Sequence, residues 1–135
     1  MKQTTEIQML GRKLAVKYSA SALKQQAQLT EAVYLEMELQ FGCLVKKAMV
    51  QKKVPPDHVT PLNDRLFLSF RPMMTNVCAP SSVDIHADES IKIIDIEKPE
   101  RFAPDWVFID YKAGAWTGDF GYERQKNKYF SATLS

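Results

Sequence analysis

Three side chains that could bind a metal ion, Asp84, His86 and Asp88, alternate along one predicted strand. Because successive side chains of a strand point to opposite faces, all three lie on one face, with neighbours about 7 Å apart. Carboxylate and imidazole groups are suitable ligands for Zn²⁺, Mn²⁺ or Fe²⁺. The same alternation is also typical of the solvent face of an ordinary amphipathic strand. The chain has only one other histidine, His58. We therefore favour the solvent face, and a metal-dependent enzyme is the last of our hypotheses.

Other catalytic patterns are weaker still. Cys43 with His58 or His86 could form a nucleophile and its base. Cys43 lies one residue beside an apolar stripe, however, and a small buried thiol is the more common role for such a cysteine. Cys43 and Cys78 are the only cysteines, and neither has a second cysteine at metal-ligand spacing. The glycines form neither a GxxxxGK[ST] loop nor a GxGxxG loop. We predict a non-enzymatic protein with no cofactor and no resident metal.

Aromatic and cationic residues are interleaved near the end of the chain. Aromatic rings stack on bases, and Lys and Arg contact phosphates, so this segment could bind single-stranded nucleic acid. The competing interpretation is a last hairpin over 122–134 whose aromatic residues close the core. A nucleic-acid-binding regulator is therefore our alternative function. The residues assigned to it are Arg124, Lys126, Lys128 and Tyr129.

Charge is distributed unevenly along the chain. Residues 1–53 carry nine Lys and Arg against four Glu, a net charge of +5. Residues 54–135 carry nine Lys and Arg against twelve Asp and Glu, a net charge of −3. The resulting dipole can steer a partner towards the molecule, but it is too weak to indicate nucleic acid by itself.

The elements that must position these groups are predicted from proline placement and hydrophobic spacing. All seven prolines follow residue 54. A capping box at Thr5 and apolar residues at helical spacing predict a helix over 5–18. A second apolar stripe at alternating spacings of four and three runs from Leu23 to Ala48, which predicts a helix that begins near Ser21 or Thr30 and ends before Pro55.

After residue 54 the period changes to that of strands. Alternation predicts strands over 66–71, 83–88, 91–96 and 106–111. Loops are expected at 73–81, between two prolines, and at 112–121, which holds three of the five glycines. We predict one α+β domain over 1–135, with a helical part (1–54) and a strand-rich part (55–135). In it, two N-terminal helices pack on an antiparallel sheet of about four to six strands. The expected core or interface residues are Trp106, Phe108, Ile85, Ile93, Leu68, Phe41, Met37 and Tyr34.

The second predicted helix supplies our functional hypothesis. A helix over 21–53 would be about 50 Å long, whereas a six-residue strand spans about 20 Å. The uncovered apolar surface would need a protein partner, with a homodimer as the simplest case. We expect a small cytoplasmic adaptor or inhibitor, without a membrane-spanning segment, of the kind common among accessory genes of bacteria and phages. The predicted interface residues are Tyr34, Met37, Glu38, Phe41 and Lys46.

Overall fold

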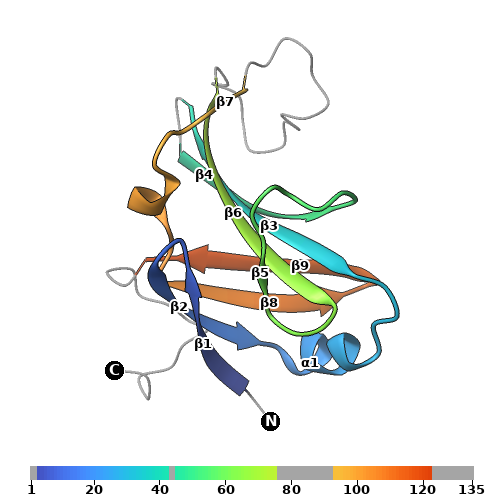
Figure 1. Cartoon of the computed structure of the whole chain (residues 1–135). Coiled ribbons are helices and arrows are strands. Elements are labelled where there is room, and N and C mark those ends of the chain that lie inside the picture. Colours follow the sequence, from blue (N-terminus) through green and yellow to red (C-terminus); the bar gives the residue numbers. More distant parts are fainter. Residues whose placement is uncertain (1–2, 43–44, 76–92, 123–135) are drawn as a thin grey trace.

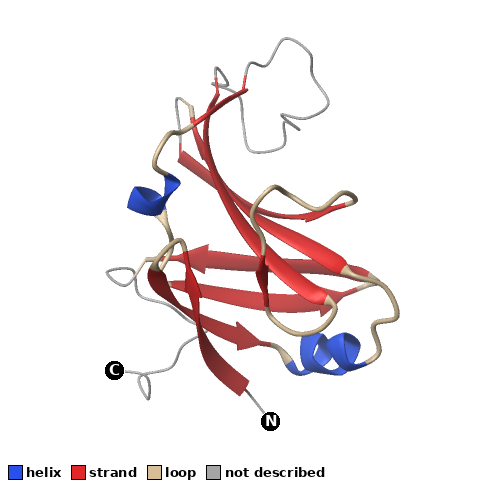
Figure 2. Cartoon of the chain, in the orientation of Figure 1, coloured by secondary structure: helices blue, strands red, loops and turns tan. Residues whose placement is uncertain are grey.

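The computed structural model describes residues 3–42, 45–75 and 93–122, and these form a mostly β structure. They hold nine strands, one α-helix and one short 3-10 helix. Strands therefore dominate the described residues of both halves of the chain (Figure 2). In chain order the elements are β1 (Gln3–Met9), β2 (Arg12–Tyr18), α1 (Ala20–Ala27), β3 (Val33–Phe41), β4 (Val45–Lys52), β5 (Thr60–Pro61), β6 (Leu66–Thr75), β7 (Ile93–Asp95), η1 (Pro99–Phe102), β8 (Trp106–Lys112) and β9 (Ala115–Gly121).

The strands form two mixed sheets that pack against each other (Figure 1). Sheet A has the order β1-β2-β8-β9, and β2 and β8 are parallel. Sheet B has the order β4-β3-β6-β5, with β7 also paired to β6, and β3 and β6 are parallel. The other pairs are antiparallel. Helix α1 closes one end of the assembly, and β9 contacts β4 and β3 of the opposite sheet.

The hydrophobic core lies between the two sheets. Each contributing strand alternates, so that one set of side chains points inward. The buried core residues of sheet A are Met9, Leu14, Val16, Tyr18, Val107, Ile109, Trp116 and Phe120, and those of sheet B are Val33, Leu35, Met37, Leu39, Leu66 and Leu68. Burial raises the pKa of the Tyr18 phenol to about 12, so this hydroxyl stays neutral inside the core.

The predicted helix over 5–18 is wrong, because these residues form the β1–β2 hairpin. Leu10 and Gly11 make its turn with φ angles of 52° and 75°, the left-handed conformation at both positions that a tight two-residue hairpin requires. Gly11 thus serves a turn and does not weaken a helix. The strand signal was the alternation of Leu14, Val16 and Tyr18, which are all buried.

The second predicted helix is also wrong beyond its first turns. Helix α1 ends at Ala27, and Val33–Phe41 and Val45–Lys52 pair as the antiparallel strands β3 and β4. The helix begins after Ser19, whose Oγ accepts a hydrogen bond from the Ala22 N–H and donates one of 2.6 Å to Asp110 Oδ1. The described part of 1–54 is therefore mainly strand. The α+β class, with two helices on one antiparallel sheet, is replaced by two packed mixed sheets and a single α-helix in the described residues.

Predictions after residue 54 have mixed outcomes. The strands expected at 66–71 and 106–111 are confirmed as β6 and β8, and β8 lies between β2 and β9 as a central strand. The loop expected at 112–121 is instead the turn at Ala113 and Gly114 followed by β9. β6 continues through Pro72 to Thr75, into the expected loop at 73–81. Proline is tolerated at position 72 because its nitrogen faces the partly unpaired edge of β6, between β5 and β7. At this edge the Pro72 carbonyl accepts a hydrogen bond from the Ile96 N–H.

The outcomes for the core are likewise mixed. Met37, Leu68 and Trp106 are buried, whereas Tyr34, Phe41, Ile93 and Phe108 are half-buried. Val107 and Ile109 carry the inward face of β8, which places Phe108 on the other face. Ile85 and most of the predicted 83–96 hairpin lie outside the described residues, as does the last predicted hairpin beyond Tyr122. In the described ranges, no helix has the length and apolar character needed to cross a bilayer.

Candidate functional site

A row of four apolar side chains crosses one end of sheet B. Phe41 of β3 is in register with Val45 of β4 on one side and with Met74 of β6 on the other. Met74 is in turn paired with Ile94 of β7. Residues directly opposite each other in a sheet share a face, so the four side chains form one line about 14 Å long across four strands. We call this line the apolar row.

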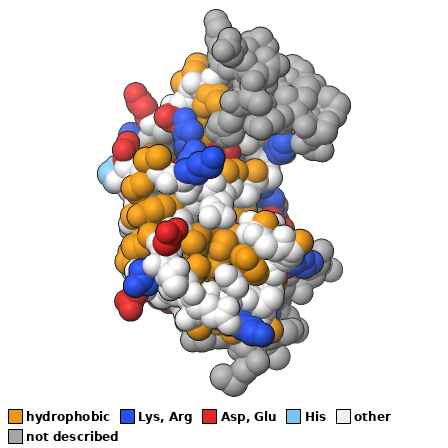
Figure 3. All heavy atoms as spheres, turned by 90° about the vertical axis from the view of Figure 1, so that its right-hand side faces the viewer, with side chains coloured by type: hydrophobic (Ala, Val, Ile, Leu, Met, Phe, Trp, Pro, Cys, Tyr) orange, Lys and Arg blue, Asp and Glu red, His pale blue; other side chains and the backbone are white. Residues whose placement is uncertain are grey.

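The apolar row is exposed although it continues the face that carries the core. Val45 is 63% exposed, Met74 54% and Ile94 63%, values that are unusual for large apolar side chains on the inward face of a sheet. The reason is visible in Figure 1, where β6 and β7 extend past the strands of sheet A. Seen from the side, hydrophobic atoms reach the surface at this upper end, as well as in a larger patch across the middle (Figure 3). Phe41 packs edge-on against Phe102, with ring centroids 5.3 Å apart.

The opposite face of β3 carries polar groups that are as deeply buried as the core. Glu36 is 4% exposed, and Glu38 and Gln40 are buried beside it on the same face. Gln40 Nε2 donates a 3.3 Å hydrogen bond to Glu38 Oε1. Within the described part of the chain, Glu36 Oε1 has no hydrogen-bond partner, and the nearest cation is Lys52 Nζ at 3.9 Å. Oε1 of this carboxyl is thus enclosed without the hydrogen bond that normally satisfies a buried polar atom.

Burial sets the protonation of this group. Desolvation, followed by the hydrogen bond and charge of Glu38, raises the pKa of Glu36 from 4.5 to about 7, although the charges of Lys52 and Arg71 oppose the shift. Arg71 of the neighbouring strand donates from Nε to Asp95 Oδ1 at 2.6 Å, and this bond raises the pKa of the guanidinium further. At neutral pH, Glu36 therefore exchanges between its acid and its carboxylate form.

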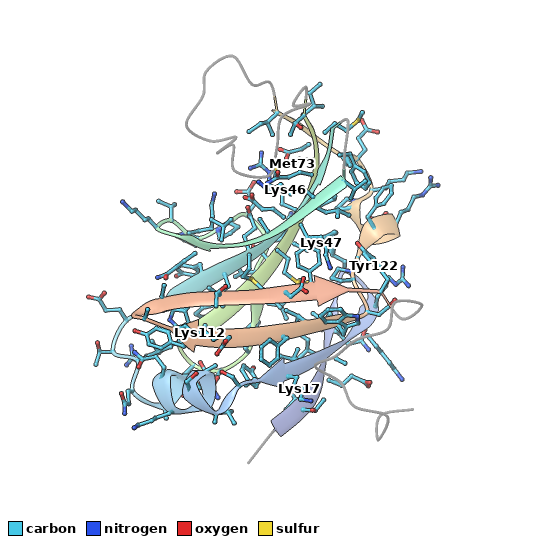
Figure 4. All side chains as sticks on the ribbon, turned by 180° about the vertical axis from the view of Figure 1, so that it is seen from behind. Lys17, Lys46, Lys47, Met73, Lys112 and Tyr122 are labelled. Carbon is cyan, nitrogen blue, oxygen red and sulfur yellow. The ribbon has the colours of Figure 1, made fainter. Side chains whose placement is uncertain are left out.

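Two lysines at the start of β4 have different roles. Lys47 Nζ lies between β4 and β9 (Figure 4), donates a 2.6 Å hydrogen bond to the Phe120 carbonyl and pairs with Asp119 at 3.1 Å. The same ammonium lies 5.6 Å from the ring centroids of Trp106 and Phe120. Lys47 is thus a link between the two sheets. Lys46 points to the other face of β4, near Met73 in the same view.

The residues predicted as a protein interface all lie on β3 and β4, on both faces of the hairpin. Tyr34 stacks on Phe67 with ring centroids 5.3 Å apart, and Glu38 shares its face. Met37 is fully buried in the core, and Phe41 belongs to the apolar row. The length argument for an uncovered helix no longer applies, since α1 has only eight residues. The structure does not bring these five residues onto one surface.

Sequence reasoning missed the other members of the apolar row. The sequence patterns predict a helix at Val45, a loop at Met74 and the return strand of a hairpin at Ile94. The apolar pair Met73 and Met74 after Pro72 was the available signal, because alternation continues through the proline. Only the pairing of β6 with β7, which is not local in sequence, places Ile94 beside Met74.

The remaining predicted site residues lie outside the described ranges. These are the metal candidates Asp84, His86 and Asp88, the nucleic-acid candidates Arg124, Lys126, Lys128 and Tyr129, and both cysteines. In residues 3–42, 45–75 and 93–122, no group of three His, Cys, Asp or Glu side chains is arranged to hold a metal ion.

Comparison with known proteins adds no assignment: no protein-family model, curated protein or solved structure matches this chain.

Proposed function

We propose that this chain is a small, non-enzymatic protein-binding protein, an adaptor or inhibitor, and that the apolar row is its contact surface. The single observation that carries the proposal is the exposure of Val45, Met74 and Ile94 in one line across the end of sheet B. Scattered apolar residues on a surface need no explanation, whereas contiguous ones mark interaction sites. We propose the cytoplasm as its compartment.

The chemistry of the row suits a protein partner. Met and Phe are enriched in protein interfaces, and a flexible methionine beside a fixed aromatic ring can adapt to an apolar surface. Phe41 is held by Phe102, so it loses little side-chain entropy on binding. The row therefore has a rigid centre, Phe41, next to the adaptable Met74.

A second copy of the chain is the simplest partner. A two-fold interface uses the same patch on both subunits, so a linear apolar row can pack against its own copy in antiparallel orientation. The row ends at β4 on one side and at β7 on the other. Such an arrangement brings the β4 end of each row to the β7 end of the other. A different protein with an apolar groove could occupy the same surface.

The test is a charge placed in the middle of the row. Met74→Lys puts an ammonium where the proposal requires contact, and Val54→Lys is the matched control, because Val54 is 71% exposed and lies after the opposite end of β4. We expect sedimentation velocity to show self-association of the wild type that Met74→Lys weakens at least tenfold and Val54→Lys leaves unchanged. If the wild type is monomeric, the same pair of variants is compared in capture of partners from cells.

Equal behaviour of the two variants in both assays would contradict the proposal. So would a wild type that stays monomeric at high micromolar concentration and captures nothing. Because both substitutions are at exposed sites, thermal unfolding should be nearly the same for both, and this measurement shows that a loss of association is not a loss of folding.

A further inference from the structure

We propose that a cavity beside the free edge of β6 binds a ligand with an apolar body and a cationic amine or guanidine head group, and that Glu36 receives the head group. This inference goes beyond the protein-binding function and does not depend on it. It concerns the edge of sheet B between β5 and β7 and the residues that close it.

The cavity exists because the edge of β6 is only partly covered. β5 pairs with Phe67 and Leu68, and β7 pairs with the segment from Met73 to Thr75. Between them Pro72 has no N–H to offer a further strand. The gap forms a cavity of about 200 Å³, whose described lining includes Glu36, His58, Phe70, Arg71, Asp95 and Pro99.

A second cavity of about 340 Å³ adjoins the first. The two share four lining residues, His58, Ser69, Phe70 and Pro99, and the second extends towards Met9 and Leu10 of the β1–β2 turn. Together they approach the size of pockets that hold small molecules, which are mostly apolar with a few polar groups that fix orientation. The walls from Phe70, Pro99 and Met9 suit an apolar body.

The polar groups select the charge of the ligand. Glu36, Asp57 and Asp95 are acidic, and Arg71 is the one Lys or Arg among the described lining residues of the first cavity. Arg71 is already bound by Asp95 through a 2.6 Å hydrogen bond. The surplus of carboxyl groups favours a cationic ligand over an anionic one.

Among the described residues that line the first cavity, Glu36 has a buried carboxyl oxygen without a hydrogen-bond donor. Its side chain is 5% exposed, and among the described residues Oε1 accepts no hydrogen bond, with Lys52 Nζ at 3.9 Å beyond bonding distance. An ammonium or guanidinium group would supply the missing donors and charge. Charge-assisted hydrogen bonds of this kind are the strong ones in proteins.

The pH dependence of binding follows from the groups around Glu36. Glu38 on its own strand raises the pKa of Glu36, and Lys52 of β4 and Arg71 of β6 lower it, while His58 and Asp95 line the same cavity. A cationic ligand binds the ionised form. With a pKa of about 7 for Glu36, the ionised fraction falls roughly tenfold between pH 8 and pH 6. The affinity for a cationic ligand should fall by the same factor.

The experiment uses benzylamine as the cationic probe and benzyl alcohol as its neutral match. Binding to the full chain is followed by amide chemical shifts at pH 8 and pH 6. We expect benzylamine to bind at millimolar concentration, roughly tenfold more weakly at pH 6 and at least tenfold more weakly to Glu36→Gln at pH 8. Glu31→Gln, which removes an exposed carboxylate outside both cavities, should change the affinity less than twofold.

A further probe, N-acetyl-arginine amide, identifies the source of the head group. If it binds with the same dependence on pH and on Glu36, the cavity accepts an arginine side chain of another protein; if only benzylamine binds, it accepts a free amine. Equal binding of benzylamine and benzyl alcohol, no binding of any probe, or an equal loss in both variants would overturn the proposal. The pH comparison uses the wild type alone, so a poorly folded variant cannot decide the result.

Discussion

Replacing Glu36 by glutamine should make the protein less sensitive to alkaline pH. The carboxyl of Glu36 is enclosed on β3, and its pKa rises from 4.5 to about 7, mainly because burial disfavours the charged form. The folded state therefore holds a proton that the unfolded state releases at lower pH. The contribution of this group to stability is complete below pH 4.5 and is lost as the pH rises through 7.

The expected size follows from the two pKa values. Each pKa unit corresponds to about 1.4 kcal/mol, so ionising Glu36 in the folded protein costs roughly 3 kcal/mol by pH 8. Between pH 5 and pH 8, this one group should lower the free energy of unfolding by roughly 2–3 kcal/mol. Glutamine has nearly the same shape, does not titrate, and can donate an N–H to Glu38. At pH 8, Glu36→Gln should therefore be more stable than the wild type, while at pH 5 the two should be nearly equal.

Urea denaturation at pH 5, 6, 7 and 8 measures this difference. Glu31→Gln is the control, because Glu31 is exposed and its replacement also removes one carboxylate. Other titrating groups are common to the wild type and both variants, so the quantity of interest is the divergence of the curves with pH. Parallel curves for wild type and Glu36→Gln, or a variant that is less stable at pH 8, would refute the reasoning.

Three further predictions concern the links and turns of the fold. Lys47→Met should lower the free energy of unfolding by about 2 kcal/mol, because Lys47 Nζ donates a charged hydrogen bond to the Phe120 carbonyl across the two sheets. Urea denaturation at pH 7 in low and high salt measures this loss. Gly118→Ala should destabilise by about 2 kcal/mol, since a Cβ at this position would lie 2.3 Å from the Phe108 carbonyl oxygen; an unchanged melting temperature would show that β8 and β9 can separate at this point. Ala113→Asn should raise the free energy of unfolding by roughly 0.5–1 kcal/mol, because Ala113 has a φ of 51° in a two-residue turn and asparagine tolerates this left-handed conformation. Gly114→Ala should lower the melting temperature, because Gly114 has a φ of 78°, which alanine adopts only with strain.

Part of the fold was predictable from sequence, and the errors share one physical cause. The strands β6 and β8 have no competing helical pattern, and both were predicted correctly. In β3, the inward residues Leu35, Met37 and Leu39 alternate, as a strand requires. Tyr34, Met37 and Phe41 of the same strand recur at spacings of three and four, so a helical pattern was equally visible. Local periodicity cannot choose between the two patterns, because sheet pairing with β6 decides between them.

The proline distribution was a weaker guide than it looked. Proline is excluded from helix interiors, but it is equally excluded from strands that are paired on both sides. The proline-free segment before residue 54 includes β2 and β3, both paired on both edges. Pro72 in β6 shows the converse, because it lies beside an edge. Absence of proline therefore indicates continuous backbone pairing of either kind and does not identify helices.

The candidate site was less predictable than the fold. The apolar row joins Val45, Phe41, Met74 and Ile94 through three strand pairings, of which only β3–β4 is local in sequence. Of its members, only Phe41 was predicted to lie at an interface. Exposure depends on where sheet A ends relative to sheet B, and no pattern in the sequence of sheet B contains that information.

The position of Glu36 is the strongest indication that this fold serves more than its own stability. The free energy of unfolding of a domain is only about 5–15 kcal/mol, so a carboxyl that lowers it by roughly 3 kcal/mol at alkaline pH removes a large part of the stability. Glutamine at the same position would avoid most of that cost, and the neighbouring core residues would be unaffected. Strongly shifted ionisable groups that line a cavity are concentrated at functional sites. If Glu36→Gln is more stable at pH 8 and also loses the cationic probe, the two results together mean that the destabilising carboxyl is the binding group. If it gains stability and binds the probe as before, the cavity proposal fails while the pKa of Glu36 stands.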